Sequence, residues 1–269
     1  MDWGPTVYLT LILGSAERSL WFFVYAAQIV LLLRLAQQGL HRRYRFFALY
    51  ILAHVAEVSA LLVLTPGTDA YALTYVAFVP VIGLCAVLAV LEVYDLVLRD
   101  YVGIRTLGRG AVAGGLALAL IVAAVTLAPD LANPNEPYLR LLYVHVFQRA
   151  LYSALLLFVL FISAFLLWFP LPLTRNAVLH TIVFSLNFAG ASLSLLLRNV
   201  GGAEFRLLSS TISLAIAAAC LLAWIVFLTR EGELGTVVSG HRWHPGEANR
   251  LVEQLDSINS SLLRSARKR

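Results

Sequence analysis

RFFALYILAHVAEVSALLVL, residues 45–64, is a stretch of twenty residues that is almost entirely apolar. A helix of that length rises about 30 Å, the thickness of the hydrocarbon core of a bilayer. His54 and Glu57 nevertheless lie near its middle. Ionisable groups at that depth are costly and need partners, so we expect other helices to pack around this one.

The composition of the whole chain is typical of a membrane protein. Of its 269 residues, 60% are hydrophobic and only 13% are charged, which leaves too little polar surface for a soluble domain. The 20 Lys and Arg exceed the 15 Asp and Glu, but they lie mainly in loops, at span ends and in the C-terminus. This distribution does not indicate nucleic-acid binding. Cys85 and Cys220 lie in apolar segments, where we expect neither a disulfide framework nor zinc.

Seven apolar runs are long enough to span a membrane. Their approximate bounds are 19–38, 46–65, 73–98, 110–128, 139–168, 176–198 and 206–229. We therefore predict an all-α fold, a polytopic seven-transmembrane-helix bundle over residues 19–229. Residues 1–18 are predicted to form a short outer segment, in which 5–14 either lies at the interface or extends the first span.

The loop arginines predict the orientation of the chain. The loops after the first, third and fifth spans carry Arg42, Arg43, Arg45, Arg105, Arg109 and Arg175. The loops after the second, fourth and sixth spans contain no basic residue, although arginines flank them at the span ends. Basic loops stay cytoplasmic, so the N-terminus is predicted outside and the C-terminus inside. We predict a multi-pass protein of the cell membrane, of the bacterial inner-membrane kind.

The cytoplasmic tail, residues 230–269, differs from the rest in being polar. It contains an apolar stripe at helical spacing, formed by Leu251, Leu255, Ile258 and Leu262. This stripe predicts a short amphipathic helix over about 247–264. Three partners remain open for it: the protein's own cytoplasmic face, a second copy of the chain, and anionic lipid. Residues 247–269 are also where a cytoplasmic or membrane protein partner is expected to bind.

Several polar side chains share one depth within the predicted bundle. Counted from the outer end of each span, they lie roughly 12–17 Å deep and are Gln28, Glu57, Arg149 and Asn187. An arginine and a carboxylate at a common depth relieve the cost of burying each other. We therefore predict that Glu57 and Arg149 pair, directly or through His54, Gln148 or water.

This polar layer has three interpretations. The pair locks two helices together, or it lines an outward-opening cavity with Arg149 available to an anionic or carbonyl-bearing ligand, or Glu57 and His54 form a proton or ion path. The predicted ligand-binding residues are His54, Glu57, Arg149, Asn187, Gln28 and His145. His145 is included because it lies one helical turn outward of Arg149.

A second polar cluster is predicted near the cytoplasmic ends of the spans. It consists of Glu92 and Asp95 in the third span and His180 in the sixth. Asp95 and Arg99 are four residues apart, which favours an ion pair at the interface. Glu92 lies about one turn deeper, where a contact with His180 is expected.

Absent residues exclude several kinds of site. The segment 206–229 contains no lysine, so a retinal Schiff base cannot form there. It contains no histidine either, so the chain does not resemble the seven-helix zinc hydrolases, which place ligands in that helix. His54 and Glu57 have the spacing of half a metal site, but the depth of the other candidate ligands does not match theirs. The chain also lacks the common catalytic and nucleotide-binding motifs. We predict no metal, no cofactor and no catalytic residue, and an enzyme is the less favoured class.

The leading functional hypothesis is a membrane sensor or receptor-like module that transduces a signal. An unknown small ligand would bind in the outward-facing polar pocket, and the tail would pass the change to a partner. In architecture alone, seven spans followed by a cytoplasmic helix resemble the membrane sensor regions of bacterial signalling proteins. The alternatives are a small-solute or proton-coupled transporter and a structural subunit of a larger membrane complex.

Overall fold

A computed structural model describes most of the chain. The described residues are 5–65, 68–99, 101–104, 139–168, 172–201, 205–238 and 245–267, with the single positions 106, 110, 114, 117 and 121. Its long helices are α1 (Pro5–Gln37), α2 (Arg45–Val63), α3 (Asp69–Val97), α5 (Leu139–Trp168), α6 (Arg175–Gly201), α7 (Arg206–Phe227) and α8 (Pro245–Arg267).

Helices α1 to α7 carry the segments that can cross a membrane. Each of these six helices contains a stretch long and apolar enough to do so, which confirms an all-α membrane protein with multiple spans. The predicted fourth span, 110–128, lies outside the described residues apart from four positions within it. Residues 5–14 extend the first span, because α1 is continuous from Pro5.

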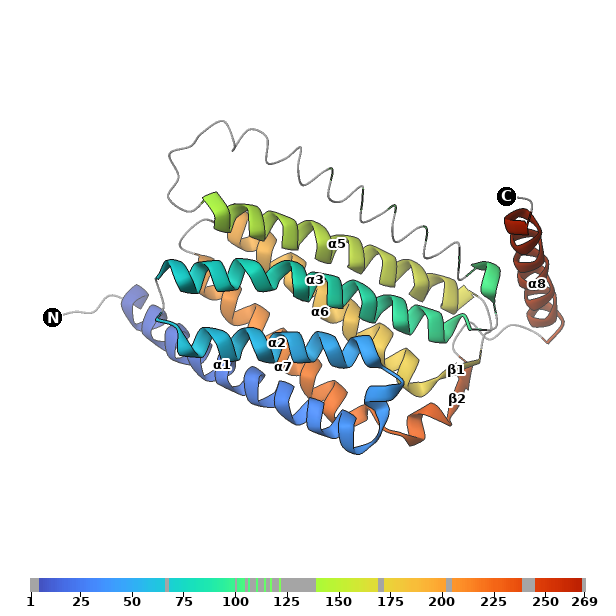
Figure 1. Ribbon diagram of the computed structural model, residues 1–269, viewed down its shortest axis with the longest axis horizontal. Coiled ribbons are helices and arrows are strands. Elements are labelled where there is room, and N and C mark those ends of the chain that lie inside the picture. The colour runs from blue at the N-terminus through green and yellow to red at the C-terminus, as the bar shows by residue number, and fades with distance from the viewer. Residues whose placement is uncertain are drawn as a thin grey trace.

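The six spanning helices form a closed ring. Helix α1 packs on α2, α2 on α3, α3 on α5, α5 on α6, α6 on α7, and α7 packs back on α1. Figure 1 shows these helices running side by side along the long axis of the molecule. A ring of this kind encloses an interior that side chains from every helix can reach.

Glycines allow two pairs of helices to approach closely. A Cβ on Gly83 of α3 would lie 2.6 Å from the Cδ2 atom of Leu151 on α5. A Cβ on Gly190 of α6 would lie 2.7 Å from the Cγ2 atom of Ile216 on α7. Small residues at such crossings are the usual means by which membrane helices gain close packing, since lipid supplies no hydrophobic driving force between them.

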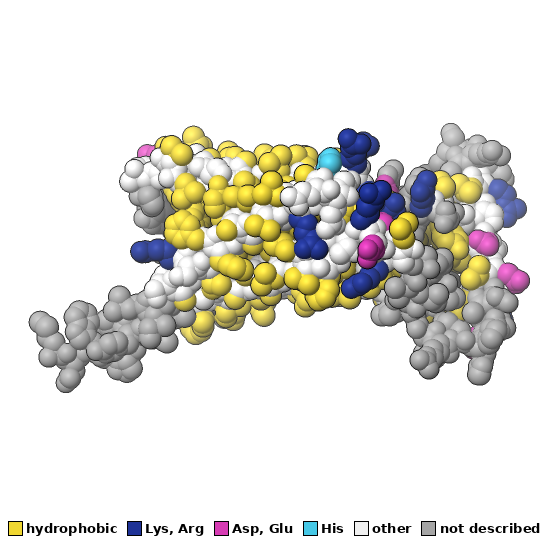
Figure 2. Space-filling view, turned by 90° about the horizontal axis from the view of Figure 1, so that it is seen from below, with side chains coloured by type: hydrophobic (Ala, Val, Ile, Leu, Met, Phe, Trp, Pro, Cys, Tyr) yellow, Lys and Arg dark blue, Asp and Glu magenta, His cyan; other side chains and the backbone are white. Residues whose placement is uncertain are grey.

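The outer surface of the ring is apolar along most of its length. Large hydrophobic side chains such as Leu157 and Leu186 are 68% and 58% exposed. Figure 2 shows hydrophobic side chains over much of the middle of one face of the molecule. In that view the Lys and Arg side chains gather mainly toward the end that carries α8. The exposed hydrophobic side chains form the apolar band that contacts the lipid bilayer.

The two ends of the ring differ. One end, here called the tail end, carries α8 and a two-stranded antiparallel sheet of β1 (Pro172–Thr174) and β2 (Thr236–Val238). The short 3-10 helices η1 (Leu40–Arg42) and η3 (Glu231–Glu233) also lie there, next to the ends of α1 and α7. The opposite end, here called the N-terminal end, lies toward the N-terminus of the chain (Figure 1).

Helix α8 docks on the tail end of its own bundle. Leu255 is 1% exposed and belongs to a hydrophobic cluster with Tyr94 and Leu98 of the α3 segment. The backbone N–H of Gly103 donates a hydrogen bond of 2.7 Å to the Asn259 side chain. The apolar stripe therefore contacts its own bundle through Leu255, and the two other partners stay predictions. Ile258 of the same stripe stays 50% exposed.

Candidate ligand cavity

A polar cavity lies inside the helix ring. Its volume is about 430 Å³, and all six spanning helices contribute to its lining. On α1 the lining residues are Glu17, Trp21, Val24 and Gln28, which share one helix face. From the first to the last of these is about 16 Å along the axis. The cavity therefore extends from the N-terminal end into the interior of the bundle.

Four of the predicted ligand-binding residues line this cavity. Gln28 of α1, His54 and Glu57 of α2, and Asn187 of α6 all lie on its wall, together with Ser213 of α7. Helices α1, α2, α6 and α7 are contiguous in the ring, so residues at a shared depth on their inner faces come together. Their role as ligand contacts remains a prediction.

Glu57 does not pair with Arg149. Its carboxylate Oε2 lies 3.6 Å from Nδ1 of His54, one turn away on the same helix. The lining of the cavity includes Gln148 and Tyr152 of α5 but not Arg149. Residues four apart share a helix face, whereas the next residue is turned by about 100°. The predicted Glu57–Arg149 ion pair is therefore wrong, because a common depth does not fix how each helix is rotated.

The remaining predicted residue of α5 is His145. Its side chain lies outside the described residues. Gln148, three residues later, accepts a hydrogen bond of 3.5 Å from the Tyr75 hydroxyl of α3, which is at the weak limit for such a bond. Gln148 therefore lines the cavity at the position along α5 where Arg149 was predicted to do so.

The wall combines carboxylates with aromatic rings. Among the described residues that line the cavity there are two carboxylates, Glu17 and Glu57, and no arginine or lysine. The Ser210 hydroxyl donates a hydrogen bond to Glu17 near the N-terminal end. The aromatic lining residues are Trp21, Tyr50, Tyr75, Tyr152 and Trp224. Such a wall suits a polar or cationic guest better than an anion.

Three polar atoms of the wall are buried without a protein partner: the Trp224 Nε1 atom, the Gln28 Oε1 atom and the Ser194 hydroxyl. The residues Gln28 and Ser194 are 7% and 3% exposed. Buried polar groups are normally hydrogen-bonded, because an unpaired one costs about 1–3 kcal/mol. All three residues line the cavity, so water or a ligand inside it can supply the missing hydrogen bonds.

Toward the tail end, the cavity gives way to an aromatic cluster. His180 has no exposed surface, and its ring centroid lies 4.5 Å from that of Tyr44 and 4.7 Å from that of Phe47. Trp224, a lining residue of the cavity, packs against Phe47 and Phe184 in the same cluster. Neither ring nitrogen of His180 has a hydrogen-bond partner among the described residues. The cluster thus meets the cavity wall at Trp224 and continues to Tyr44 at the tail end.

The predicted contact between Glu92 and His180 is not formed. The Glu92 carboxylate instead accepts hydrogen bonds of 2.7, 3.0 and 3.1 Å from the backbone N–H groups of Arg45, Phe46 and Phe47. These are unpaired donors in the first turn of α2, and the partial positive charge of a helix N-terminus favours a carboxylate there. Neither Glu92, Asp95 nor His180 lines the cavity.

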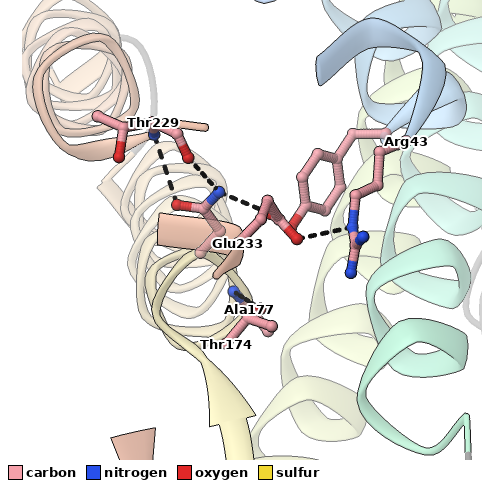
Figure 3. Close-up of polar contacts among 7 residues, drawn as sticks. Arg43, Thr174, Ala177, Thr229 and Glu233 are labelled. Carbon is pink, nitrogen blue, oxygen red and sulfur yellow. Dashed lines mark hydrogen bonds and ion pairs between the residues drawn. The ribbon is translucent and has the colours of Figure 1, made fainter. Parts of the chain in front are cut away.

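A network of polar contacts at the tail end was not predicted (Figure 3). Glu233 Oε2 lies 2.6 Å from Nε of Arg43, and the other carboxylate oxygen accepts hydrogen bonds from the Tyr44 hydroxyl and from Asn176 Nδ2. Asn176 Nδ2 also donates a bond of 2.7 Å to the Thr229 carbonyl. The network thus joins the α1–α2 connection, the start of α6 and the segment after α7.

Burial changes the pKa of one member of this network. Burial raises the pKa of the Tyr44 phenol above its usual value, and the hydrogen bond to Glu233 raises it further. The phenol therefore remains a donor at physiological pH. The sequence signal for this network is slight: Asn176 and Glu233 stand at span ends, where polar residues are expected for simpler reasons.

The described residues contain no group of three or more His, Cys, Asp or Glu side chains arranged to hold a metal ion. Cys85 and Cys220 are both free and buried. No family model, no curated protein and no solved structure matches the chain. The cavity and its surroundings are therefore the features of the molecule that bear on its function.

Proposed function

We propose that the chain is a non-enzymatic membrane receptor or sensor, with seven spans, the N-terminus outside and the C-terminus in the cytoplasm. A small ligand binds in the cavity from the outer side, and the change reaches a partner protein through α8. The observation that carries the proposal is a cavity with polar side chains, lined by all six spanning helices, whose wall meets a packed aromatic cluster at Trp224.

The aromatic cluster favours a receptor over a transporter. A transporter needs a polar route to both faces, and Glu92, Asp95 and His180 are the side chains expected to line its cytoplasmic half. The lining of the cavity includes none of them. A purely structural subunit would in turn have no need of an interior cavity with unpaired polar groups.

The tail-end network offers a physical connection from the cavity to α8. Trp224 lies on the cavity wall, and Thr229 and Glu233 of the network follow it within a few residues along the same segment. That segment continues into β2 and then toward α8. A shift of α7 on ligand binding would therefore act on contacts that hold the α1–α2 connection and α6.

The sidedness of access to Ser213 tests this proposal. A Ser213→Cys variant is made in a Cys85→Ala/Cys220→Ala background, reconstituted in vesicles of defined orientation and treated with a membrane-impermeant thiol reagent from one side at a time. We expect labelling only from the N-terminal side. Labelling from both sides would indicate a transporter, and labelling from neither would contradict an open cavity. Leu193→Cys, on the lipid-facing surface, is the unlabelled control.

A further inference from the structure

We infer that the ligand of the cavity is a small organic cation, a primary or quaternary ammonium compound bound between Glu57 and the aromatic wall. This inference rests on the proposed receptor function and names the class of ligand for the same cavity. It reverses the expectation of an anionic ligand, which depended on Arg149 reaching the pocket.

The first support is the charge of the wall. Glu57 is 8% exposed, and its nearest charged or ionisable partner is His54 at 3.6 Å. That distance is longer than a normal hydrogen bond. No described residue donates a hydrogen bond to the Glu57 carboxylate, and no described arginine or lysine lines the cavity. A buried carboxylate is stabilised by a positive partner, and an ammonium ligand would provide one.

The second support is the aromatic surface around the carboxylate. Tyr50 packs edge-on against His54, with ring centroids 4.8 Å apart, and Tyr152 lies on the same wall. An aromatic face attracts a cation with about 0.5–2 kcal/mol, most strongly where water is excluded. Aromatic rings grouped with a carboxylate therefore recognise an ammonium group by two independent interactions.

The third support is the set of unpaired polar atoms. Gln28 Oε1 and the Ser194 hydroxyl lack protein partners, and the first is an acceptor only. Acceptors on the wall suit the N–H or O–H donors of an amine or an amino alcohol. A volume of about 430 Å³ accommodates such a molecule with several ordered waters.

Three probes of one shape but different charge test the inference. They are choline, its neutral isostere 3,3-dimethylbutan-1-ol, and the anion 3,3-dimethylbutanoate. Binding to the full-length protein in detergent is followed by tryptophan fluorescence, since Trp21 and Trp224 line the cavity. We expect choline to bind more than about tenfold more tightly than either isostere, and to raise the unfolding temperature.

Two variants locate the effect. Glu57→Gln keeps the shape and removes the charge, and we expect it to weaken choline binding about tenfold or more. Asp69→Asn, at the exposed first turn of α3 at the same end of the bundle, should leave the affinity unchanged. Equal affinity for all three probes, tighter binding of the anion, no binding of choline, or an unaffected Glu57→Gln variant would each overturn the inference. The receptor proposal is tested separately, by the sidedness of labelling at Ser213.

Discussion

Glu57 is the residue whose surroundings say most about the interior of the bundle. A carboxylate that is 8% exposed and lies mid-way along a membrane span is costly unless something in the cavity compensates it. His54 is the side chain placed to do so within the protein. The arrangement keeps an acidic side chain facing an interior space, which is a common sign of a functional rather than a packing role.

Adding one carbon atom at Gly232 tests how tightly the tail-end network is packed. A Cβ at this position would lie 2.2 Å from the Asn176 Oδ1 atom, and Asn176 has no exposed surface. Gly232→Ala should therefore displace Asn176 from Thr229 and Glu233 and lower the free energy of unfolding by about 1–3 kcal/mol. Thermal unfolding in detergent measures the loss.

Gly235→Ala is the matched control for that change. Its Cβ would meet nothing closer than the Glu231 carbonyl at 3.9 Å, so its unfolding temperature should stay close to that of the parent. If the two glycine variants unfold at the same temperature, the network around Asn176 is not packed as described.

Sequence reasoning at this scale identified some cavity residues and missed others for a physical reason. Counting residues from the outer end of each span identified Gln28, Glu57 and Asn187 as lying at one depth. This works because each residue of a helix advances the chain by a fixed distance along the helix axis. The count could not give the rotation of α5 about its own axis. The prediction therefore chose Arg149, although its neighbour Gln148 lies on the cavity wall.

The start of α2 is the element whose stability depends most clearly on another helix. No side chain of its own caps it, and the Glu92 carboxylate of α3 accepts the N–H groups of its first turn. This contact couples the two helices at the tail end. It also explains why a carboxylate occurs within an otherwise apolar span.

Replacing Glu92 tests this capping role. Glu92→Ala leaves three backbone donors unpaired and should lower the free energy of unfolding by about 1–2 kcal/mol. Glu92→Gln retains one acceptor oxygen and should lower it by less. Reversible unfolding in mixed micelles gives both values. An alanine variant as stable as the parent would show that solvent or headgroups satisfy these donors equally well.

The helices themselves were largely predictable, because long apolar runs in a membrane protein form helices and little else. The predicted span 139–168 coincides with α5 (Leu139–Trp168), and four others agree with their helices to within about four residues. The first, 19–38, starts well after α1, which begins at Pro5, and 110–128 lies largely outside the described residues. The β1–β2 pairing joins residues more than sixty positions apart. No local pattern could indicate it, since both strands are three residues long.

At the scale of the whole molecule, the order of helices around the ring determines which side chains face the cavity. The contact of α1 with α7 closes the ring, and all six helices then face one cavity. Hydropathy indicates how many segments span the membrane, but it does not show which helices pack against each other. The sequence could therefore predict only that several polar residues lie at one depth, not the cavity that they line. The outside of the bundle is a large apolar band (Figure 2), whereas the cavity wall carries polar side chains. Residues of one helix that face outward should therefore contact lipid, and those that face inward should contact water.

Nitroxide labels at Ser213 and Leu186, compared in a lipid bilayer, test most directly whether the inside of the ring is accessible to water while its outside faces lipid. Each label is attached through a single cysteine, and its collision rates with a water-soluble nickel chelate and with oxygen are measured by electron paramagnetic resonance. Ser213 lines the cavity and should favour the nickel chelate, whereas Leu186, 58% exposed on the outer band, should favour oxygen. If the label at Ser213 instead favours oxygen as strongly as the label at Leu186, the helices do not enclose a water-accessible polar cavity.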